Sequence, residues 1–209
     1  MANKILVHGS GHRAASWQET VSHLDDKEGL LCPDLCSLLA GRAASYGNLC
    51  AAFAEYCGRI DGPVHLCGLS LGGILALNYT LDCPDKVKTL VLIGTPHKVP
   101  RAAFGFQNLI FRLLPRSVFD TMAFDKENTF ALGNSMKDLD FSGKVGRIQC
   151  PTLIICGEKD RSNLKSAHYL AQNIQGAELR LIEHTGHVVN EENPKALAER
   201  LNAFYAAHP

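Results

Sequence analysis

A serine flanked by glycines constrains this chain more than any other feature. The stretch runs Val64-His-Leu-Cys-Gly-Leu-Ser-Leu-Gly-Gly-Ile-Leu-Ala-Leu77. An apolar run that predicts a strand ends near Gly68, and an alanine-containing apolar run that predicts a helix follows Ser70. Where a strand turns this sharply into a helix, the backbones around Gly68 and Gly72 nearly touch, so a Cβ fits at neither. The pattern predicts a strained turn that exposes the Ser70 hydroxyl, with the amide of Leu71 beside it.

Short apolar runs alternate with longer amphipathic segments along most of the chain. They predict strands at 4–8, 29–32, 64–67, 88–93, 152–156 and 178–182, and helices at about 16–24, 45–60, 72–82, 163–174 and 194–207. Continuous apolar strands separated by helices indicate a parallel sheet that is covered on both faces. We therefore expect an α/β fold, a three-layer α/β/α sandwich around a mostly parallel, roughly six-stranded sheet.

Residues 97–142 interrupt this alternation. They hold seven of the nine phenylalanines, and Pro100 and Pro115 divide them into short segments. We assign 1–96 and 143–209 to the α/β core and 97–142 to an inserted helical cap over the carboxyl ends of the strands. Most of the rings are expected to form the cap's own core, while the candidates to line a substrate pocket are Phe104, Phe106, Phe111, Phe119 and Phe124. Arg112 and Arg116 either form a solvated helix face, the favoured interpretation, or bind a substrate carboxylate.

Composition excludes several classes of function. With 209 residues, 46% hydrophobic and 20% charged, the chain resembles a single globular domain. A net charge of zero gives no indication of binding to nucleic acid or to an anionic membrane. The N-terminal residues show no secretory hydrophobic region, so we expect a cytoplasmic protein whose eight cysteines are reduced, mostly buried thiols. We expect no metal and no cofactor.

Two later loops contain the partners that a nucleophilic serine needs. A serine hydroxyl requires a base, and an imidazole base requires a carboxylate to fix its tautomer. Asp160 follows the predicted strand 152–156, and His187 follows the strand 178–182, so both are expected at the same edge as Ser70. Glu158 is a rival acid and His184 a rival base. The His-x-x-His pair lacks a third ligand at a suitable spacing, which argues against a zinc site.

The glycine-rich loop after the first strand is the candidate for the second half of an oxyanion hole. It reads His8-Gly-Ser-Gly-His12, without bulky side chains. We expect the amides of Ser10 and Leu71 to stabilise a developing oxyanion together. A plain strand-to-helix turn remains the alternative for this loop.

Together these motifs resemble the α/β-hydrolase family over nearly the whole chain. The similar segments are His8-Gly9 with Trp17, Pro33-Asp34-Leu35, Gly68–Gly73, Cys83 to Leu92, Gly157–Asp160, and His187 with Glu192-Asn193-Pro194. The chain begins directly at the strand before the oxyanion loop, so the family's usual leading hairpin is missing. This departure predicts a reduced six-stranded core and an edge that a partner subunit protects. We expect a monomer or a homodimer, and the protected edge would apply to the homodimer. The turn after Pro33-Asp34 also lacks the family's glycine-rich continuation, which affects the pocket rim.

The resemblance implies a metal-free Ser-His-Asp hydrolase. We expect a carboxylesterase that cleaves small to medium, apolar esters through an acyl-enzyme on Ser70. The alternative within the fold is a C–C bond hydrolase or lyase-like enzyme for a carboxylated metabolite. A ligand-binding protein that retains the scaffold without turnover is the alternative from a different class.

Overall fold

In the computed structural model, residues 3–99, 119 and 122–209 are described. Within these ranges, six strands form one sheet: β1 (Lys4–Val7), β2 (Leu30–Leu31), β3 (Val64–Leu69), β4 (Val87–Ile93), β5 (Thr152–Gly157) and β6 (Glu178–Ile182). Their order is β2-β1-β3-β4-β5-β6, and every neighbouring pair is parallel. The predicted six-stranded parallel sheet is thereby confirmed.

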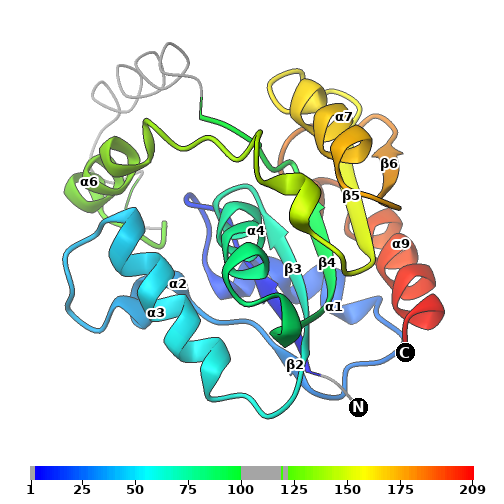
Figure 1. The fold of residues 1–209 in the computed structure, drawn as a ribbon, viewed down its shortest axis with the longest axis horizontal. Helices are drawn as coiled ribbons and strands as arrows, with labels where there is room; N and C mark the ends of the chain where they lie inside the picture. The colour runs from blue at the N-terminus through cyan, green and yellow to red at the C-terminus, as the bar shows by residue number, and fades with distance from the viewer. Residues whose placement is uncertain (1–2, 100–118, 120–121) are drawn as a thin grey trace.

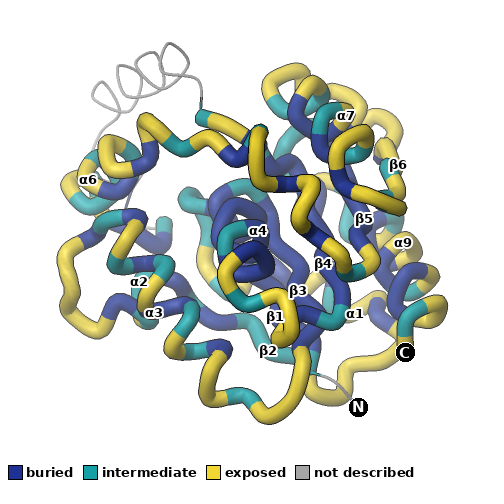
Figure 2. Tube along the Cα trace, viewed as in Figure 1, coloured by how far each residue is buried: buried dark blue, intermediate teal, exposed yellow. Residues whose placement is uncertain are grey.

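Helices cover both faces of this sheet (Figure 1). One core cluster packs α3 (Tyr46–Gly58), α4 (Leu71–Asp82) and α7 (Leu164–Asn173) against one face. The second cluster packs α9 (Pro194–Ala207) and Trp17, just before α1 (Gln18–Ser22), against the other face. Because strand side chains alternate between faces, Leu66 belongs to the first cluster and Cys67 to the second. Burial on both faces explains the continuous apolar character of the central strands (Figure 2).

The strand order places a topological switch point where the site is expected. The sheet extends from β1 to β2 on one side and through β3 to β6 on the other. The direction in which successive strands are added therefore reverses between β1 and β3, although all strands are parallel. Ligands bind at such a switch point, beyond the carboxyl ends of the strands. At Gly72, in the first turn of α4, a Cβ would collide with the backbone of Val7 and His8. The start of α4 therefore packs directly on the end of β1.

Some short elements differ from the prediction. The predicted helix 16–24 consists of a 3-10 turn, η1 (Ala14–Trp17), followed by α1. Two unpredicted helices are α2 (Leu35–Leu39) and α8 (Val189–Glu192). Asp34 caps α2 by accepting a hydrogen bond from the Ser37 amide at 3.3 Å. Short 3-10 turns also lie at Pro84–Lys86 (η2) and Val145–Arg147 (η4).

The two ends of the 97–142 segment lie together. Lys98 forms an antiparallel bridge with Asp140, and the Phe141 amide donates to the His97 carbonyl at 2.9 Å. Between them, α6 (Lys126–Met136) is tied to α3 because the Tyr46 amide donates to the Ser135 hydroxyl at 2.8 Å. The candidates Phe104, Phe106, Phe111, Arg112 and Arg116, with Pro100 and Pro115, lie outside the described residues.

The burial of the cysteines differs from the prediction. All eight cysteines are free thiols, but only Cys57, Cys67 and Cys156 are buried and the other five are half-buried, so the prediction of mostly buried thiols was wrong. Their place near the ends of elements accounts for the partial exposure of Cys32, Cys83 and Cys150.

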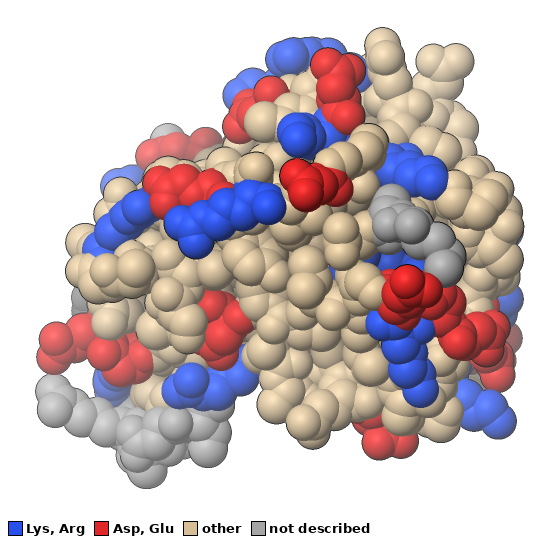
Figure 3. Space-filling model, turned by 90° about the horizontal axis from the view of Figure 1, so that it is seen from below, with Lys and Arg blue, Asp and Glu red and all other residues tan. Residues whose placement is uncertain are grey.

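Acidic and basic side chains adjoin one another on the face in Figure 3. Within the described ranges, no helix combines the length and apolarity needed to cross a bilayer.

Candidate active site

Ser70 lies in a strained turn between β3 and α4. Its φ is 53° and its ψ is −112°, a combination that residues with a side chain rarely adopt. A Cβ at Gly68 would overlap the backbone of Gly72, so close approach of these two glycines permits the turn. The Ser70 amide donates to the Ile93 carbonyl at 2.8 Å, which fixes the turn to the end of β4. The half-buried serine therefore lies at the carboxyl edge of the sheet.

Asp160 and His187 meet at the same edge. His187 Nδ1 lies 2.7 Å from Asp160 Oδ2, and the Asp160 side chain is only 4% exposed, against 39% for His187. Because a carboxylate only accepts, Nδ1 of His187 is the donor in this contact, and in the neutral ring Nε2 is therefore the acceptor. Burial alone would raise the pKa of Asp160, but hydrogen bonds from His187 and from Asn163 outweigh it and lower the pKa below 3.8. Asp160 is therefore ionised at neutral pH.

Asn163 is a contributor that sequence reasoning missed. Its side-chain amide donates to Oδ2 of Asp160 at 2.8 Å and to Oδ1 at 3.0 Å. Its backbone amide also donates to Oδ1, at 3.2 Å. The spacing of three residues from Asp160, directly before the helix α7, was the available signal for this local turn.

The rival acid and base lie apart from this pair. The His184 side chain is 86% exposed, and the Glu158 side chain lies beside it, with Oε2 3.9 Å from His184 Nδ1. Glu158 Oε2 also accepts from the backbone amide of His184 at 2.9 Å. Among the described residues, no three His, Cys, Asp or Glu side chains gather as metal ligands would.

The end of β4 connects the serine to the Asp160–His187 pair. Gly94 follows Ile93, the residue that accepts from the Ser70 amide. A Cβ at Gly94 would lie 3.0 Å from His187 Nδ1 and 3.3 Å from Asp160 Oδ2. With φ at +51°, Gly94 also has a backbone conformation that favours glycine. The Ser70 backbone and the Asp160–His187 pair thus contact two adjacent residues, Ile93 and Gly94, at the end of β4.

The loop after β1 packs against Ser70. A Cβ at Gly9 would lie 3.6 Å from Ser70 Cβ, and Ser10 follows it, half-buried. His8 fixes this loop: its Nδ1 donates to the Gly9 carbonyl at 2.8 Å, and its Nε2 accepts from the Leu35 amide at 3.0 Å. Burial lowers the pKa of His8, which keeps the ring neutral as this double role requires.

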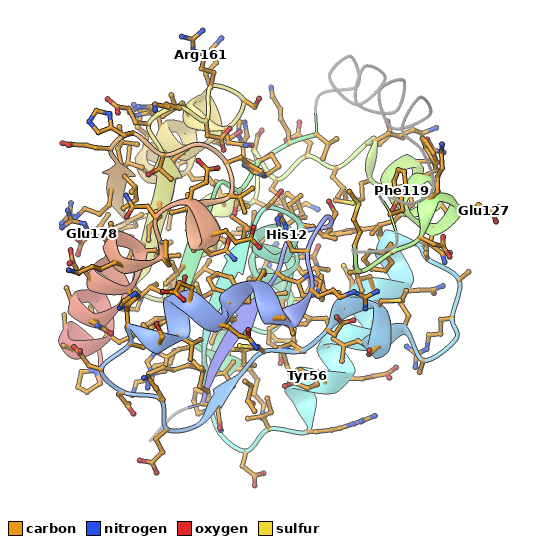
Figure 4. All side chains as sticks on the ribbon, turned by 180° about the vertical axis from the view of Figure 1, so that it is seen from behind. His12, Tyr56, Phe119, Glu127, Arg161 and Glu178 are labelled. Atoms are coloured by element: carbon orange, nitrogen blue, oxygen red, sulfur yellow. The ribbon has the colours of Figure 1, made fainter. Side chains whose placement is uncertain are left out.

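His12 ends the same loop and lies near the centre of the molecule in Figure 4, whereas Arg161 and Glu178 point outward at its periphery. Burial, the main cause, and the charge of His187 lower the pKa of His12, which Glu191 opposes. Among the described residues, Nδ1 of His12 is buried without a hydrogen-bond partner. The loop therefore lies within electrostatic range of His187.

Two of the five candidate pocket phenylalanines fall on described residues. Phe119 and Phe124 are both buried. Phe124 belongs to the core cluster that also contains Leu132 and Met136 of α6. Lys126 Nζ lies over the Phe119 ring, 5.7 Å from its centroid.

Known proteins resemble this chain over most of its length. The sequence model described as "Alpha/beta hydrolase family" matches residues 5–200. A 2-hydroxy-6-oxononadienedioate/2-hydroxy-6-oxononatrienedioate hydrolase from Klebsiella pneumoniae is 26% identical, over 97% of this chain and 86% of its own. A pimeloyl-[acyl-carrier protein] methyl ester esterase from Nitrosomonas europaea is 25% identical, over 88% of this chain and 87% of its own.

The fold leads to the same group of proteins. A thermophilic esterase from Thermogutta terrifontis superposes with a TM-score of 0.82 at 20% identity, over all of this chain and 91% of its own. The strand order, the family match and the hydrolase relatives agree with one another. This chain belongs to the alpha/beta hydrolase family.

Proposed function

We propose that the chain is a serine hydrolase that cleaves small to medium, apolar carboxylic esters through an acyl-enzyme on Ser70. The observation that carries the proposal is the 2.7 Å contact of His187 with buried Asp160, at the sheet edge that also presents Ser70. This contact leaves Nε2 of His187 free to accept a proton. An esterase among the relatives supports the choice of an ester bond.

The proposed mechanism uses groups of this chain alone. Ser70 Oγ attacks the ester carbonyl while His187 takes its proton, and Asp160 orients the imidazole and stabilises its cationic form. The amides of Ser10 and Leu71 donate to the oxyanion of the tetrahedral intermediate. The alcohol leaves with the proton from His187. A water molecule deprotonated by His187 then attacks the acyl-enzyme, the acyl–Oγ bond breaks to release the acid, and His187 returns the proton to Ser70.

We also propose that residues 97–142 form a cap over this site. The segment leaves the core after β4, at the carboxyl edge, and its two ends pair through Lys98 and Asp140. An insertion with paired ends departs from the core and returns to it at one place. Its phenylalanine-rich composition suits an apolar acyl chain.

The second candidate is a C–C bond hydrolase for a carboxylated metabolite. It is favoured by the Klebsiella relative, whose name describes a dienedioate substrate. Such a substrate needs a cationic ligand for its carboxylate, for which Arg112 and Arg116 are the candidates. A non-catalytic binding protein is disfavoured, because the backbone strain at Ser70 would then have no use.

Labelling with a fluorophosphonate probe tests the proposal first. Wild type should be labelled, Ser70→Ala not at all, and His187→Ala at a rate lower by about 10²–10⁴-fold, the usual contribution of a general base. Ser162→Ala removes an exposed hydroxyl close to Asp160 in sequence and is the matched control, with labelling unchanged. Labelling of the Ser70→Ala variant would contradict the proposal.

Nitrophenyl esters of increasing acyl length then separate the two enzyme classes. Turnover of short and medium esters, abolished in Ser70→Ala, is the expected result. A wild type that accepts the probe but hydrolyses these esters poorly would favour the C–C bond hydrolase instead. Intact folding of each variant is checked by circular dichroism.

A further inference from the structure

The four-residue helix α8 begins two residues after His187 and has contacts on two sides of the site. Three consecutive polar residues, Asn190, Glu191 and Glu192, have partners outside the helix. Asn190 faces the segment that follows the oxyanion loop, and Glu191 faces His12 at the end of that loop. Glu192 faces the loop that carries His187. The helix thus lies between two parts of the candidate site.

Glu192 binds the backbone on both sides of His187. Its Oε2 accepts from the Gly186 amide at 2.6 Å, and its Oε1 accepts from the Val188 amide at 3.0 Å. A Cβ at Gly186 would lie 2.9 Å from both carboxylate oxygens, so glycine permits this approach. Hydrogen bonds from a backbone amide to a carboxylate are about twice as strong as neutral ones. The carboxylate therefore restrains the two peptide units that define where His187 sits.

Asn190 binds the segment on the other side. It is fully buried, and its side-chain amide donates to the Ser16 carbonyl at 2.9 Å. The backbone carbonyl of Asn190 accepts a hydrogen bond from the Thr20 hydroxyl at 3.0 Å. Ser16 and Thr20 follow the oxyanion loop in sequence, within η1 and α1. Glu191 extends this side, with Oε2 3.9 Å from Nε2 of His12.

We propose that α8 fixes His187 relative to the oxyanion loop, with Glu192 as the positioning residue for His187. The proposal rests on the serine hydrolase function proposed above. A base that must reach the serine hydroxyl while an oxyanion forms nearby tolerates little displacement, since about 1 Å of error can cost about 100-fold in rate. One short helix supplies that restraint, because it binds the loop of His187 and the segment that directly follows the oxyanion loop.

Three variants test it. Glu192→Ala removes both bonds, whereas Glu192→Gln keeps one accepting oxygen and turns an N–H₂ group toward the other amide. Glu183→Gln is the matched control, because it makes the same change at an exposed glutamate four residues before His187. Relative to wild type, the fluorophosphonate labelling rate should fall about tenfold in Glu192→Gln and about 100-fold in Glu192→Ala. It should stay within about twofold in the control, as for a surface change.

A second readout does not depend on activity. Proton NMR should show a downfield resonance from the His187 Nδ1 proton shared with Asp160, assigned by its loss in His187→Ala. This resonance should broaden in Glu192→Gln and more so in Glu192→Ala, and it should stay sharp in Glu183→Gln. If Glu192→Ala does not fold, Glu192→Gln carries the test, because it retains one bond.

The possible outcomes separate the two proposals. An unchanged resonance and an unchanged labelling rate in both Glu192 variants would overturn the role of α8. A wild type without this resonance would overturn it too, because the imidazole would then not be held. If the probe fails to label wild type while the resonance responds to Glu192 as expected, the serine hydrolase function falls and the role of α8 stands.

Discussion

The backbone at Ser70 stores strain that its neighbours compensate. A non-glycine residue at φ 53° and ψ −112° costs on the order of 1–3 kcal/mol. The hydrogen bond to Ile93, the close approach of Gly68 to Gly72 and the helix that starts at Leu71 together hold this conformation. The cost is local, whereas the stabilisation comes from two strands and a helix.

Adding a methyl group at Gly94 should lower both the stability of the protein and the labelling rate of Ser70, whereas the same change at a remote glycine should lower the stability alone. Gly94→Ala places a Cβ 3.0 Å from His187 Nδ1 and keeps a residue at φ +51°, so we expect it to lose about 1–2 kcal/mol of unfolding free energy and about tenfold in labelling rate. Gly176→Ala is the control, because φ there is +72° and no atom of the described residues would lie within 4 Å of the added Cβ. It should lose the stability alone, measured by urea unfolding. Equal labelling rates in the two variants would show that Gly94 does not restrain the Asp160–His187 pair.

The choice between rival residues illustrates the limit of sequence reasoning at this scale. Asp160 and Glu158 both follow β5 within three residues, so spacing alone cannot separate them. What separates them is tertiary: Asn163 and His187 surround Asp160, whereas Glu158 turns to the amide of His184. The hydrogen bonds of Glu192 are likewise invisible in the sequence, since they depend on how the loop 183–188 folds back on α8.

Helix α7 holds both ends of the 97–142 segment. The ring of Tyr169 stacks on that of His97 at 4.1 Å, and its hydroxyl donates to the Ser142 carbonyl at 2.9 Å. Ser166 of the same helix lies 3.0 Å from His97 Nδ1. One helix of the core thereby contacts both ends of the segment, near His97 and near Ser142.

Removing the Tyr169 hydroxyl should loosen the chain at Ser142, where the 97–142 segment rejoins the core. The stacking of the Tyr169 ring on His97, where the segment begins, should remain. We expect Tyr169→Phe to cost about 1 kcal/mol of unfolding free energy, the usual contribution of one hydrogen bond. Hydrogen exchange should accelerate at the amides of Val99 and Phe141, which bond across the paired ends. Tyr56→Phe, on α3, is the control. Exchange that is unchanged at both amides would show that Tyr169 does not hold these ends.

The length of an element decides how well the sequence predicts it. The helices α3, α4, α7 and α9 and the strands other than β2 appear within a few residues of their predicted places, because each has an apolar pattern at least four residues long. The two-residue strand β2 is the exception, since it is predicted from the short apolar run before Pro33. Helices α2 and α8 span five and four residues, too few for a 3.6-residue period to show. For α2 the cap at Asp34 was the only local signal. The helix proposed to align the site is therefore among the elements hardest to predict.

Buried histidines make the stability of the whole molecule depend on pH. Burial, with the nearby charges of Lys88 and Lys4, lowers the pKa of His65 to about 4, and the His65 side chain bonds to Thr89 at 2.8 Å. The unfolded chain takes up this proton near pH 6.5, before the folded protein does. The contribution of His65 is thus complete above pH 6.5 and is lost as the pH falls toward 4. The pKa of Asp160 is lowered below 3.8, so its contribution is lost only at lower pH.

Urea unfolding at pH 7 and at pH 4.5 tests this dependence. We expect the unfolding free energy of wild type to fall over this range, with up to about 3 kcal/mol of the loss due to His65. His65→Gln should be less stable at pH 7 but should lose less between the two values. A variant with the same slope as wild type would assign the pH dependence to other groups. His168→Gln, at an exposed position on α7, is the control.

The two ends of the fold lie together, opposite the site. Lys4, at the start of β1, places its ammonium 5.9 Å from the ring centroid of Tyr205, near the end of α9. Ser70, Asp160 and His187 instead follow the carboxyl ends of β3, β5 and β6. A solid support attached through the last residues of α9 would therefore hold the molecule by its amino edge. The carboxyl ends of β1 and β3 would then face the bulk solution. The architecture suits oriented immobilisation, in which every tethered copy presents the same face to its substrate.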